Sequence, residues 1–405
     1  MLRASTVSPS AVSSGPNCSA EPFEPQSSWL PLGQPFDTLR AVSMVEPSSS
    51  LSPETAGSWL LTCNASGMKP TFQMQLVNGP WGDPALLVRI RWARRALLFD
   101  LGSIATVPSG DLLRVSEVFV SHTHLDHFVG FDHLLRTVLG RDRILSLFGP
   151  PGIIGNVEGK LRGYTWNLVQ GYPLRLEVFE VDPDWIRGAH FACKEAFRRQ
   201  DLAARPFTGE LWDEPGFRIR AAHLDHQIPC LAFAIEEPFH INIDKERLAG
   251  LDLPVGPWLA ELKANIRAGV GDETQIPVRW PGGRTETFSL GELKGAIISV
   301  TPGQKMAYVT DALYSPENVA RIVTLAKGAD ALYCEAAYLD RDASLAAERF
   351  HLTARQAGLI ARQAEVRRLV LFHFSPRYQG ETEAFHREAR EAFGGWVTVP
   401  GGHWD

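Results

Sequence analysis

Residues 121–127 read SHTHLDH and directly follow VSEVFV (115–120), an apolar run of the kind that forms a buried strand. The chain holds only 12 histidines in 405 residues, yet three of them lie within this stretch, together with an aspartate. Imidazole and carboxylate groups at such short spacing are common ligands of divalent transition metals. The pattern therefore predicts a metal site at the end of a strand.

Three further apolar runs end on residues of the same chemical kind. They are FRIRAA (217–222) before His223 and His226, KMAYVT (305–310) before Asp311, and RRLVLF (367–372) before His373. Ligands in α/β proteins gather on the loops at strand ends, because a rigid sheet fixes where each loop begins. We therefore expect these four distant segments to meet at one site.

The spacing within the segments suits two ions rather than one. His122 and His124 are two residues apart on an extended segment, so their side chains point the same way and can bind one ion. Asp126 and His127 follow where the chain turns into a helix and can bind a second ion nearby. Asp311 can bridge the two ions, and ions about 3.5–4 Å apart clamp substrate oxygens and lower the pKa of a bound water.

The segment from His223 to His226 leaves a choice of ligand. His223 shares its strand parity with Phe217 and Ile219, so it can equally belong to the face that packs inward. His226 follows the strand and precedes a loop. We predict His226 as the ligand.

Composition excludes several classes of protein. The content of 44% hydrophobic and 21% charged residues is that of a soluble globular chain. A net charge of -6 argues against a broad nucleic-acid-coating surface, though not against a local basic patch. No apolar run is long enough to span a membrane. Five scattered cysteines without a CxxC pair favour a reducing compartment, so we expect a cytoplasmic protein.

The chain divides by composition into two parts. Residues 1–57 are rich in Ser and Pro and cannot bury enough apolar surface to offset their ordering entropy, so we predict a disordered extension. A start site placed too early is an equally simple explanation. In residues 58–405 a series of strands precedes strands that alternate with helices, which predicts one layered α/β domain.

The HxHxDH spacing at 122–127 resembles that of the metallo-β-lactamase superfamily, and further motifs resemble its ribonuclease Z branch. The likeness spans roughly residues 70 to 400 and implies a four-layer αββα sandwich with the site at one rim. The similar stretches are LLFDLG (97–102), SHTHLDHFVGFDHLL (121–135), LDHQIPCLAFAIEE (224–237), GPWLAELKANIRAG (256–269), KMAYVTD (305–311), CEAAYLDRDASLAAERFHLTARQAG (334–358) and LVLFHFSPRYQG (369–380).

The resemblance implies a role for each matching residue. Asp126 would help to activate the attacking water, and Glu335 with His351 would deliver a proton to the leaving oxygen. Ser375 and Arg377 match positions beside the scissile phosphate. Two zinc ions, or two of another divalent metal such as Mn²⁺, would be held by two ligand sets that share a bridging Asp311: His122, His124 and His226, and Asp126, His127 and His373.

The chain departs from the family pattern in several places. The usual HEAT reads CEAA at 334–337, and HST reads HLT at 351–353. The segment 238–270, where the family carries an arm that grips the transfer RNA elbow, has few glycines. Residues 186–213 look like an insertion. The hydrolytic core is therefore better supported than the substrate.

The resemblance implies a dinuclear metal-dependent phosphodiesterase, an endoribonuclease that removes the 3′ trailer from precursor tRNA, often as a homodimer. One alternative is a hydrolase of the same fold that acts on a small ester, thioester or cyclic nucleotide, which the net charge of -6 mildly favours. The other is a non-catalytic, metal-stabilised nucleic-acid-binding module. Glu335 and His351 argue against this last reading, because a binding module needs no proton donor.

Six arginines are candidate phosphate contacts for an RNA substrate. Each of them, taken singly, is better explained as an ordinary solvated position. They are Arg89, Arg91, Arg94, Arg95, Arg141 and Arg143.

Overall fold

The computed structural model of the chain describes residues 71–400. The predicted disordered extension, residues 1–57, and the predicted domain start at residue 58 lie outside these residues. Within the described part, none of the helices has the length and apolar character needed to cross a membrane.

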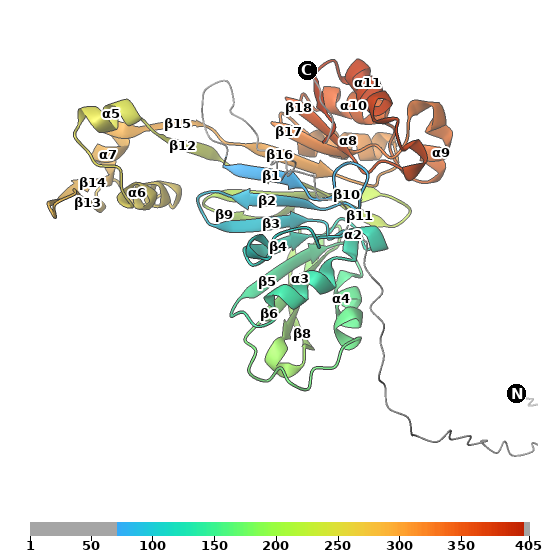
Figure 1. Ribbon diagram of the computed structural model, residues 1–405, viewed down its shortest axis with the longest axis horizontal. Coiled ribbons are helices and arrows are strands. Elements are labelled where there is room, and N and C mark those ends of the chain that lie inside the picture. Colours follow the sequence, from blue (N-terminus) through green and yellow to red (C-terminus); the bar gives the residue numbers. More distant parts are fainter. Residues whose placement is uncertain (1–70, 401–405) are drawn as a thin grey trace, which may run out of the picture. The chain divides into compact units, whose positions relative to one another are not determined.

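The first of two large sheets follows the chain order of its eight strands (Figure 1). Its strands from β3 to β6 run parallel, so their carboxyl ends lie along one edge. The strands are β1 (Phe72–Leu76), β2 (Leu86–Ile90), β3 (Arg95–Phe99), β4 (Val115–Phe119), β5 (Ile144–Gly149), β6 (Arg175–Val181), β7 (Trp185–Ala192) and β8 (Arg198–Pro206).

The second large sheet has seven strands in the order β19-β18-β17-β16-β11-β10-β9. The strands from β16 to β19 run parallel, and β9, β10 and β11 join antiparallel beside β16. Their bounds are β9 (Glu210–Glu214), β10 (Phe217–Asp225), β11 (Pro229–Glu236), β16 (Lys305–Val309), β17 (Ala331–Glu335), β18 (Arg368–Phe372) and β19 (Trp396–Thr398).

Helices cover the outer face of each sheet, which gives the predicted four layers. Helices α1 (Ser109–Leu112), α2 (Leu125–Phe128), α3 (Phe131–Val138) and α4 (Ile153–Arg162) belong to the first half of the chain. Helices α8 (Pro316–Ala326), α9 (Ala343–Glu348), α10 (Ala354–Gln363) and α11 (Thr382–Phe393) belong to the second half.

The apolar run of β3 is continuous because both faces of the strand are buried. Ala96 and Leu98 belong to the core under the helices, whereas Leu97 and Phe99 belong to the core between the sheets. The Phe99 ring lies 5.8 Å from that of Phe233 on β11 of the opposite sheet. The two sheets therefore pack face to face, as the αββα prediction requires.

The pattern at 128–140 predicts a helix, which the structure confirms as α3, although the helix begins three residues later than predicted. Helix α2 ends at Phe128 and α3 begins three residues later, with Gly130 between them. The Gly130 N–H donates to Leu101 O at 2.7 Å, and a Cβ on Gly130 would come within 2.2 Å of Gly102 O. This close approach to the loop after β3 interrupts the helix.

Residues 238–304 form a small module with its own core, here called the arm module. Strands β12 and β15 pair antiparallel and connect it to the second sheet. Its elements are β12 (Phe239–Ile243), α5 (Lys245–Gly250), α6 (Trp258–Arg267), β13 (Gln275–Arg279), β14 (Thr285–Ser289), α7 (Leu290–Ile297) and β15 (Ile298–Pro302). Residues 186–213, which look like an insertion in the sequence, form β7, β8 and most of β9.

Arg95 joins the two large sheets through charge pairs. Its guanidinium lies 2.5 Å from Glu117 on neighbouring β4 and 2.9 Å from Glu214 on β9 of the opposite sheet. Its Cζ also lies 5.4 Å from the centre of the Phe217 ring. Glu117 is only 4% exposed, so its charge depends on Arg95 for compensation.

We expect Arg95→Met to lower the free energy of unfolding by about 3 kcal/mol, because it removes the ion pair of the buried Glu117 carboxylate. Urea denaturation measures this change. Arg94→Met, at an exposed position in the adjacent turn, is the control and should change stability by about 0.5 kcal/mol or less. Equal effects of the two substitutions would show that the inter-sheet pairs do not stabilise the fold.

Candidate metal centre

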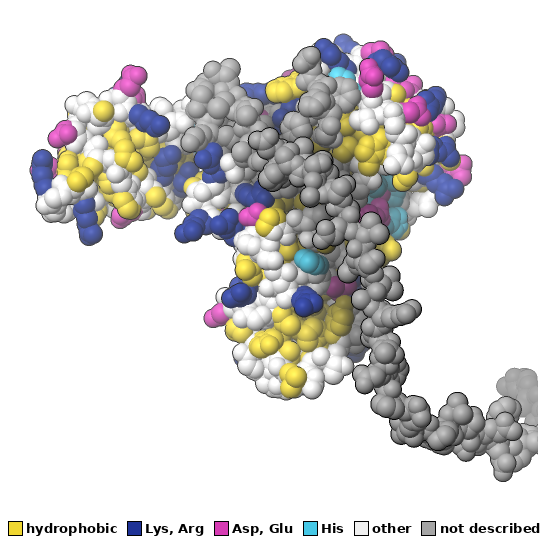
Figure 2. Space-filling view, in the orientation of Figure 1, with side chains coloured by type: hydrophobic (Ala, Val, Ile, Leu, Met, Phe, Trp, Pro, Cys, Tyr) yellow, Lys and Arg dark blue, Asp and Glu magenta, His cyan; other side chains and the backbone are white. Residues whose placement is uncertain are grey.

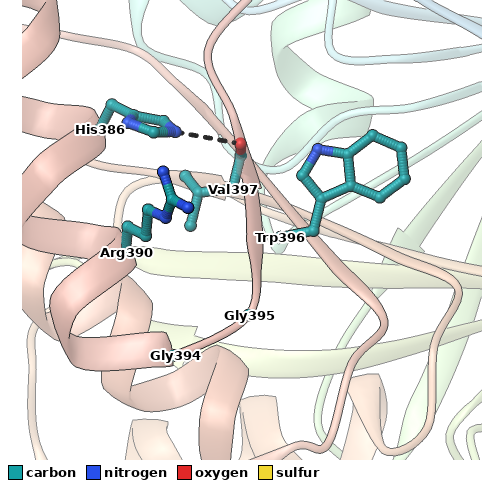
Figure 3. A pocket seen from close by; sticks show the side chains of 6 residues that line it. All are labelled: His386, Arg390, Gly394, Gly395, Trp396 and Val397. Carbon is teal, nitrogen blue, oxygen red and sulfur yellow. Dashed lines mark hydrogen bonds between the residues drawn. The ribbon is translucent and has the colours of Figure 1, made fainter. Parts of the chain in front are cut away.

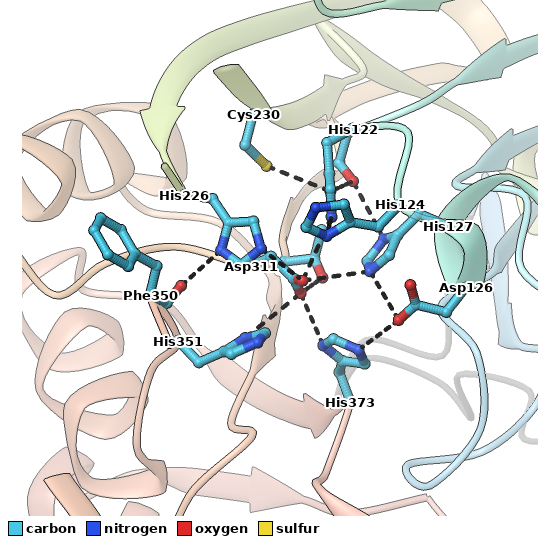
Figure 4. A network of polar contacts seen from close by, with 12 residues as sticks. His122, His124, Asp126, His127, His226, Cys230, Asp311, Phe350, His351 and His373 are labelled. Atoms are coloured by element: carbon cyan, nitrogen blue, oxygen red, sulfur yellow. Dashed lines mark hydrogen bonds and ion pairs between the residues drawn. The ribbon is translucent and has the colours of Figure 1, made fainter. Parts of the chain in front are cut away.

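The predicted metal ligands lie together where β4, β16 and β18 end and where β10 turns into β11 (Figure 4). His122 and His127 are completely buried, and His226 is 6% exposed. The side chains point toward one another from four segments that are distant in the chain. The sequence prediction that these segments meet is confirmed by the structure.

Asp311 lies at the middle of the cluster. Its Oδ2 is 3.5 Å from His122 Nε2 and 3.4 Å from His226 Nε2, and its Oδ1 is 2.8 Å from His373 Nδ1. Oδ2 is also 3.5 Å from His127 Nε2. The carboxylate thus faces both predicted ligand sets at once. Burial alone would raise the pKa of Asp311, but the charges of His373 and His127 hold it well below its usual range.

The potential ligand atoms form three overlapping groups. Within each group the atoms lie within 4.8 Å of one another, which is close enough to share one ion. The first two groups correspond to the two predicted ligand sets. The groups are His122, His124, His226 and Asp311; Asp126, His127 and His373; and Asp311, Glu335, His351 and His373.

The histidine tautomers fit a metal. His127 Nδ1 donates to Asp100 Oδ2 at 3.0 Å, and His226 Nδ1 donates to Phe350 O at 2.8 Å. In a neutral ring this leaves the lone pair on Nε2, which in both residues faces Asp311. His127 Nε2 is buried and has no hydrogen-bond partner within residues 71–400. The donor set therefore suits a divalent cation.

The electrostatics of the cluster also favour a cation. Burial lowers the pKa of His127, but the charges of Asp311 and Asp100 outweigh burial and raise it to about 10. Burial would raise the pKa of Asp126, but the hydrogen bond from His373 and the charge of His127 lower it to about 2. The ionised carboxylates attract positive charge to this point, whether from protons or from a divalent ion. These groups could hold a divalent metal ion.

The structure distinguishes His226 from His223. The Nε2 of His223 lies 2.9 Å from the backbone carbonyl of Val181, away from Asp311. Strand β10 extends to Asp225, so His226 is the first residue past the strand. The geometry agrees with the choice of His226 as the ligand.

Asp100 belongs to the site, although the sequence interpretation gave it no role. It follows β3 with a φ of +59° and is completely buried. Besides the His127 ring, it accepts hydrogen bonds from Ser121 N (2.6 Å), Ser121 Oγ (2.9 Å) and Tyr308 OH (2.9 Å). The signal was present in the sequence, because Asp100 is a carboxylate at the end of an apolar run, as Asp311 is.

Glu335 and His351 form a pair beside the cluster. His351 Nδ1 lies 2.8 Å from Glu335 Oε2 and 3.9 Å from Asp311 Oδ1. Glu335 is completely buried and also accepts from the backbone N–H groups of Ala312 (2.7 Å) and Leu352 (3.3 Å). Burial lowers the pKa of His351, but the charge and hydrogen bond of Glu335 outweigh burial and raise it. The pair therefore favours the protonated form of the His351 imidazole at the edge of the cluster.

The two predicted substrate contacts lie just after the ligand His373. Ser375 is half-buried and its N–H donates to Ala337 O at 3.1 Å. Arg377 is exposed in the short turn Pro376–Tyr378. Neither residue belongs to the three groups of ligand atoms. Their contact with a phosphate remains a prediction.

The structure divides the six candidate phosphate-binding arginines into two sets. Arg89, Arg95 and Arg143 have partners inside the fold, namely Asp111, the two glutamates described above, and the carbonyls of Leu113 and Val115. Arg91, Arg94 and Arg141 are exposed.

A separate hollow lies between α11 and β19 (Figure 3). Its volume is about 450 Å³, and none of the predicted ligands lines it. The lining residues are His386, Arg390, Gly394, Gly395, Trp396 and Val397. It is not part of the candidate metal centre.

Comparison with known proteins finds relatives of this chain. Residues 254–374 match the model of a β-lactamase superfamily domain. The chain is 35% identical over 300 residues to ribonuclease Z of Deinococcus radiodurans, a match that covers 73% of this chain and 86% of the relative. It is 32% identical over 321 residues to ribonuclease Z of Thermobifida fusca, which covers 76% and 85%. Human tRNase Z, short form, is a solved structure with 18% identity and a TM-score of 0.44, covering 74% of this chain and 92% of that chain.

We expect His226→Ala to lower both the metal content and the turnover of bis-p-nitrophenyl phosphate, because Nε2 of His226 faces Asp311. His223→Ala is the matched control and should retain both properties, since its ring contacts a backbone carbonyl instead. Elemental analysis and steady-state kinetics measure the two quantities. The assignment would be reversed if His223→Ala abolished them while His226→Ala had a mild effect.

Proposed function

The chain belongs to the ribonuclease Z family of the metallo-β-lactamase superfamily, and from this premise we propose that it removes 3′ trailers from precursor tRNA. It is a metal-dependent hydrolase of the endoribonuclease type. One observation carries the proposal: a carboxylate–imidazole pair, Glu335 and His351, lies against the metal-type cluster at Asp311. An enzyme that expels a poor leaving group needs such a proton donor, whereas a binding module does not.

The proposed cofactor is a pair of zinc ions, with Mn²⁺ or another divalent metal as an alternative. His122, His124 and His226 would hold one ion, and Asp311 would contact both. Asp126, His127 and His373 would hold the second ion. When bound, such a pair polarises the phosphodiester and lowers the pKa of the attacking water.

The chain's own residues would handle the two protons of the reaction. Asp126 is 43% exposed, so its carboxylate can be reached from solvent, and we assign it the proton of the attacking water. Its Oδ2 lies 3.3 Å from His373 Nε2, which holds the side chain at the cluster. His351 uses Nδ1 to bind Glu335, which leaves its Nε2 proton for the leaving oxygen.

Substrate binding would involve residues outside the cluster. The resemblance supports the assignment of Ser375 and Arg377 as contacts of the scissile phosphate. Arg377 is exposed and lies four residues after His373. Exposed arginines elsewhere are candidates for contacts with the RNA backbone. The resemblance also supports a homodimer that acts in the cytoplasm.

The alternative function, hydrolysis of a small ester, would use the same metal centre. Its substrate would need no binding contact outside that centre. A comparison of precursor tRNA with bis-p-nitrophenyl phosphate as substrates separates the two functions. Efficient cleavage of the small diester together with no cleavage of precursor tRNA would contradict the proposed function.

We expect about two metal ions per chain, because the predicted ligands form two sets around Asp311. Elemental analysis of protein purified without chelator measures the stoichiometry. A value at or below one, with no gain of activity on adding zinc, would contradict the dinuclear mechanism.

We expect His351→Ala to slow cleavage of precursor tRNA by about two orders of magnitude or more without changing metal content. Hydrolysis of bis-p-nitrophenyl phosphate should suffer far less, because its leaving group needs little protonation. His133→Ala, at an exposed position on α3, is the control and should leave both rates unchanged.

Equal losses on the two substrates would mean that His351 has a structural role. Unchanged rates on both would mean that the Glu335–His351 pair does not deliver the proton.

A further inference from the structure

Helix α6 of the arm module presents two different faces. Trp258 and Leu262 are buried in the module's own core, and Ile266 packs against that core. Lys263 and Arg267 are one turn apart and lie on another face of the helix. Because the apolar face already supports the module, the cationic face is available for a contact outside it.

That contact is with Trp92, in the turn between β2 and β3. The Cζ of Arg267 lies 4.6 Å from the centre of the indole ring, within the range of a cation–π interaction. The Arg267 Nε is buried and has no hydrogen-bond partner in the described part of the chain. The edge of the same ring approaches Gly216 just before β10, where a Cβ would come within 2.2 Å of the indole. The indole is thus held between the body of the protein and the arm module.

A buried carboxylate lies at the root of the same module. Glu237 follows β11, and its side chain is only 1% exposed. Thr71 Oγ1 donates to its Oε1 at 2.9 Å, His240 Nδ1 lies 3.1 Å from its Oε2, and Gln304 N lies 3.4 Å from the same oxygen. The carboxylate therefore links the residue before β1 to β12 and to the loop between β15 and β16.

The charge of Glu237 also reaches α6. Burial lowers the pKa of Arg267, and the negative charge of Glu237 opposes that shift. Burial and the positive charge of neighbouring Arg267 lower the pKa of Lys263, and the negative charge of Glu237 opposes this shift as well. The negative charge of Glu237 therefore favours the protonated forms of both side chains. Lys and Arg side chains gather on this part of the surface (Figure 2).

The arm module is joined to the second sheet at the end of β11 that is distant from the metal centre. His226 lies just before β11 and Glu237 just after it. The eight residues of β11 span about 26 Å of extended chain. A small diester at the metal centre cannot reach the module, whereas an RNA can.

We propose that the Trp92–Arg267 stack, together with Glu237, fixes the direction in which the arm module leaves the sheets, and thereby positions a long RNA substrate. Trp92 and Arg267 are positioning residues, since neither lies at the metal centre. This inference rests on the proposed function for its RNA substrate. The geometric part, the fixed direction of the module, does not depend on it.

The first experiment measures the direction of the module in the full-length protein. Spin labels at Thr285→Cys on β14 and Arg362→Cys on α10, both exposed positions, report the distance between module and body. Cys18 and Cys63 are replaced by Ser, since the other three cysteines are buried. Labelled protein is diluted with unlabelled protein so that each distance lies within one chain. Trp92→Ala and Arg267→Ala should broaden the distance distribution, and Trp92→Phe should restore much of it.

The second experiment measures kinetics on two substrates. Trp92→Ala and Arg267→Ala should raise KM for precursor tRNA on the order of tenfold, the loss of one cation–π contact, with kcat little changed. Both variants should hydrolyse bis-p-nitrophenyl phosphate at the original rate. Trp396→Ala is the matched control, because Trp396 is exposed and stacks with Arg368 at 5.6 Å on the body. It should change neither the distances nor the kinetics.

Two results would overturn the inference. An unchanged distance distribution in Trp92→Ala would show that the stack does not hold the module. A broadened distribution with unchanged KM for precursor tRNA would show that the direction of the module does not position the RNA. A wild-type protein that fails to cleave precursor tRNA would instead contradict the proposed function, and the distance measurement would still test the stack.

Discussion

The carboxylate of Asp311 is the point on which the arrangement of this protein depends. It is buried, yet it remains ionised because imidazoles from three other segments surround it. A buried carboxylate without compensation would be very costly, so the fold must bring positive charge to it. The histidines and a divalent ion meet that need together. The same arrangement that stabilises the carboxylate therefore also builds the hydrolytic centre.

Two sheets packed face to face explain why these groups can meet. Each sheet contains parallel strands, so the residues that follow their carboxyl ends lie along one edge. Asp100 and the histidine motif follow strands of the first sheet, and Asp311 and His373 follow strands of the second. Arg95 pairs with Glu214 across the sheets. The layered core thus holds the two halves of the site at a fixed separation, as the proposed catalysis by a pair of ions requires.

The opposite ends of the second sheet carry different functions. The metal centre lies at one end of β11, and the arm module begins at the other. The chemistry at the metal centre is local and suits any phosphodiester that can reach it. Discrimination in favour of a long RNA must come from contacts made far from the cleaved bond. The binding energy of such contacts can be used for specificity. The contact of Arg267 with Trp92 is important for this reason, since it sets where those distant contacts lie.

The sequence by itself predicted the layered α/β class, the strands that end on metal-type residues and the candidate metal ligands. These features are local, because strand periodicity and the spacing of HxHxDH are properties of short stretches. The tertiary structure added the physical reason for choosing His226 over His223, because the His226 ring faces Asp311 whereas the His223 ring faces a backbone carbonyl. It also revealed the role of Asp100 and the break at Gly130. The role of Asp100 and the break at Gly130 both depend on close contacts between distant segments, and no local sequence pattern predicts such contacts.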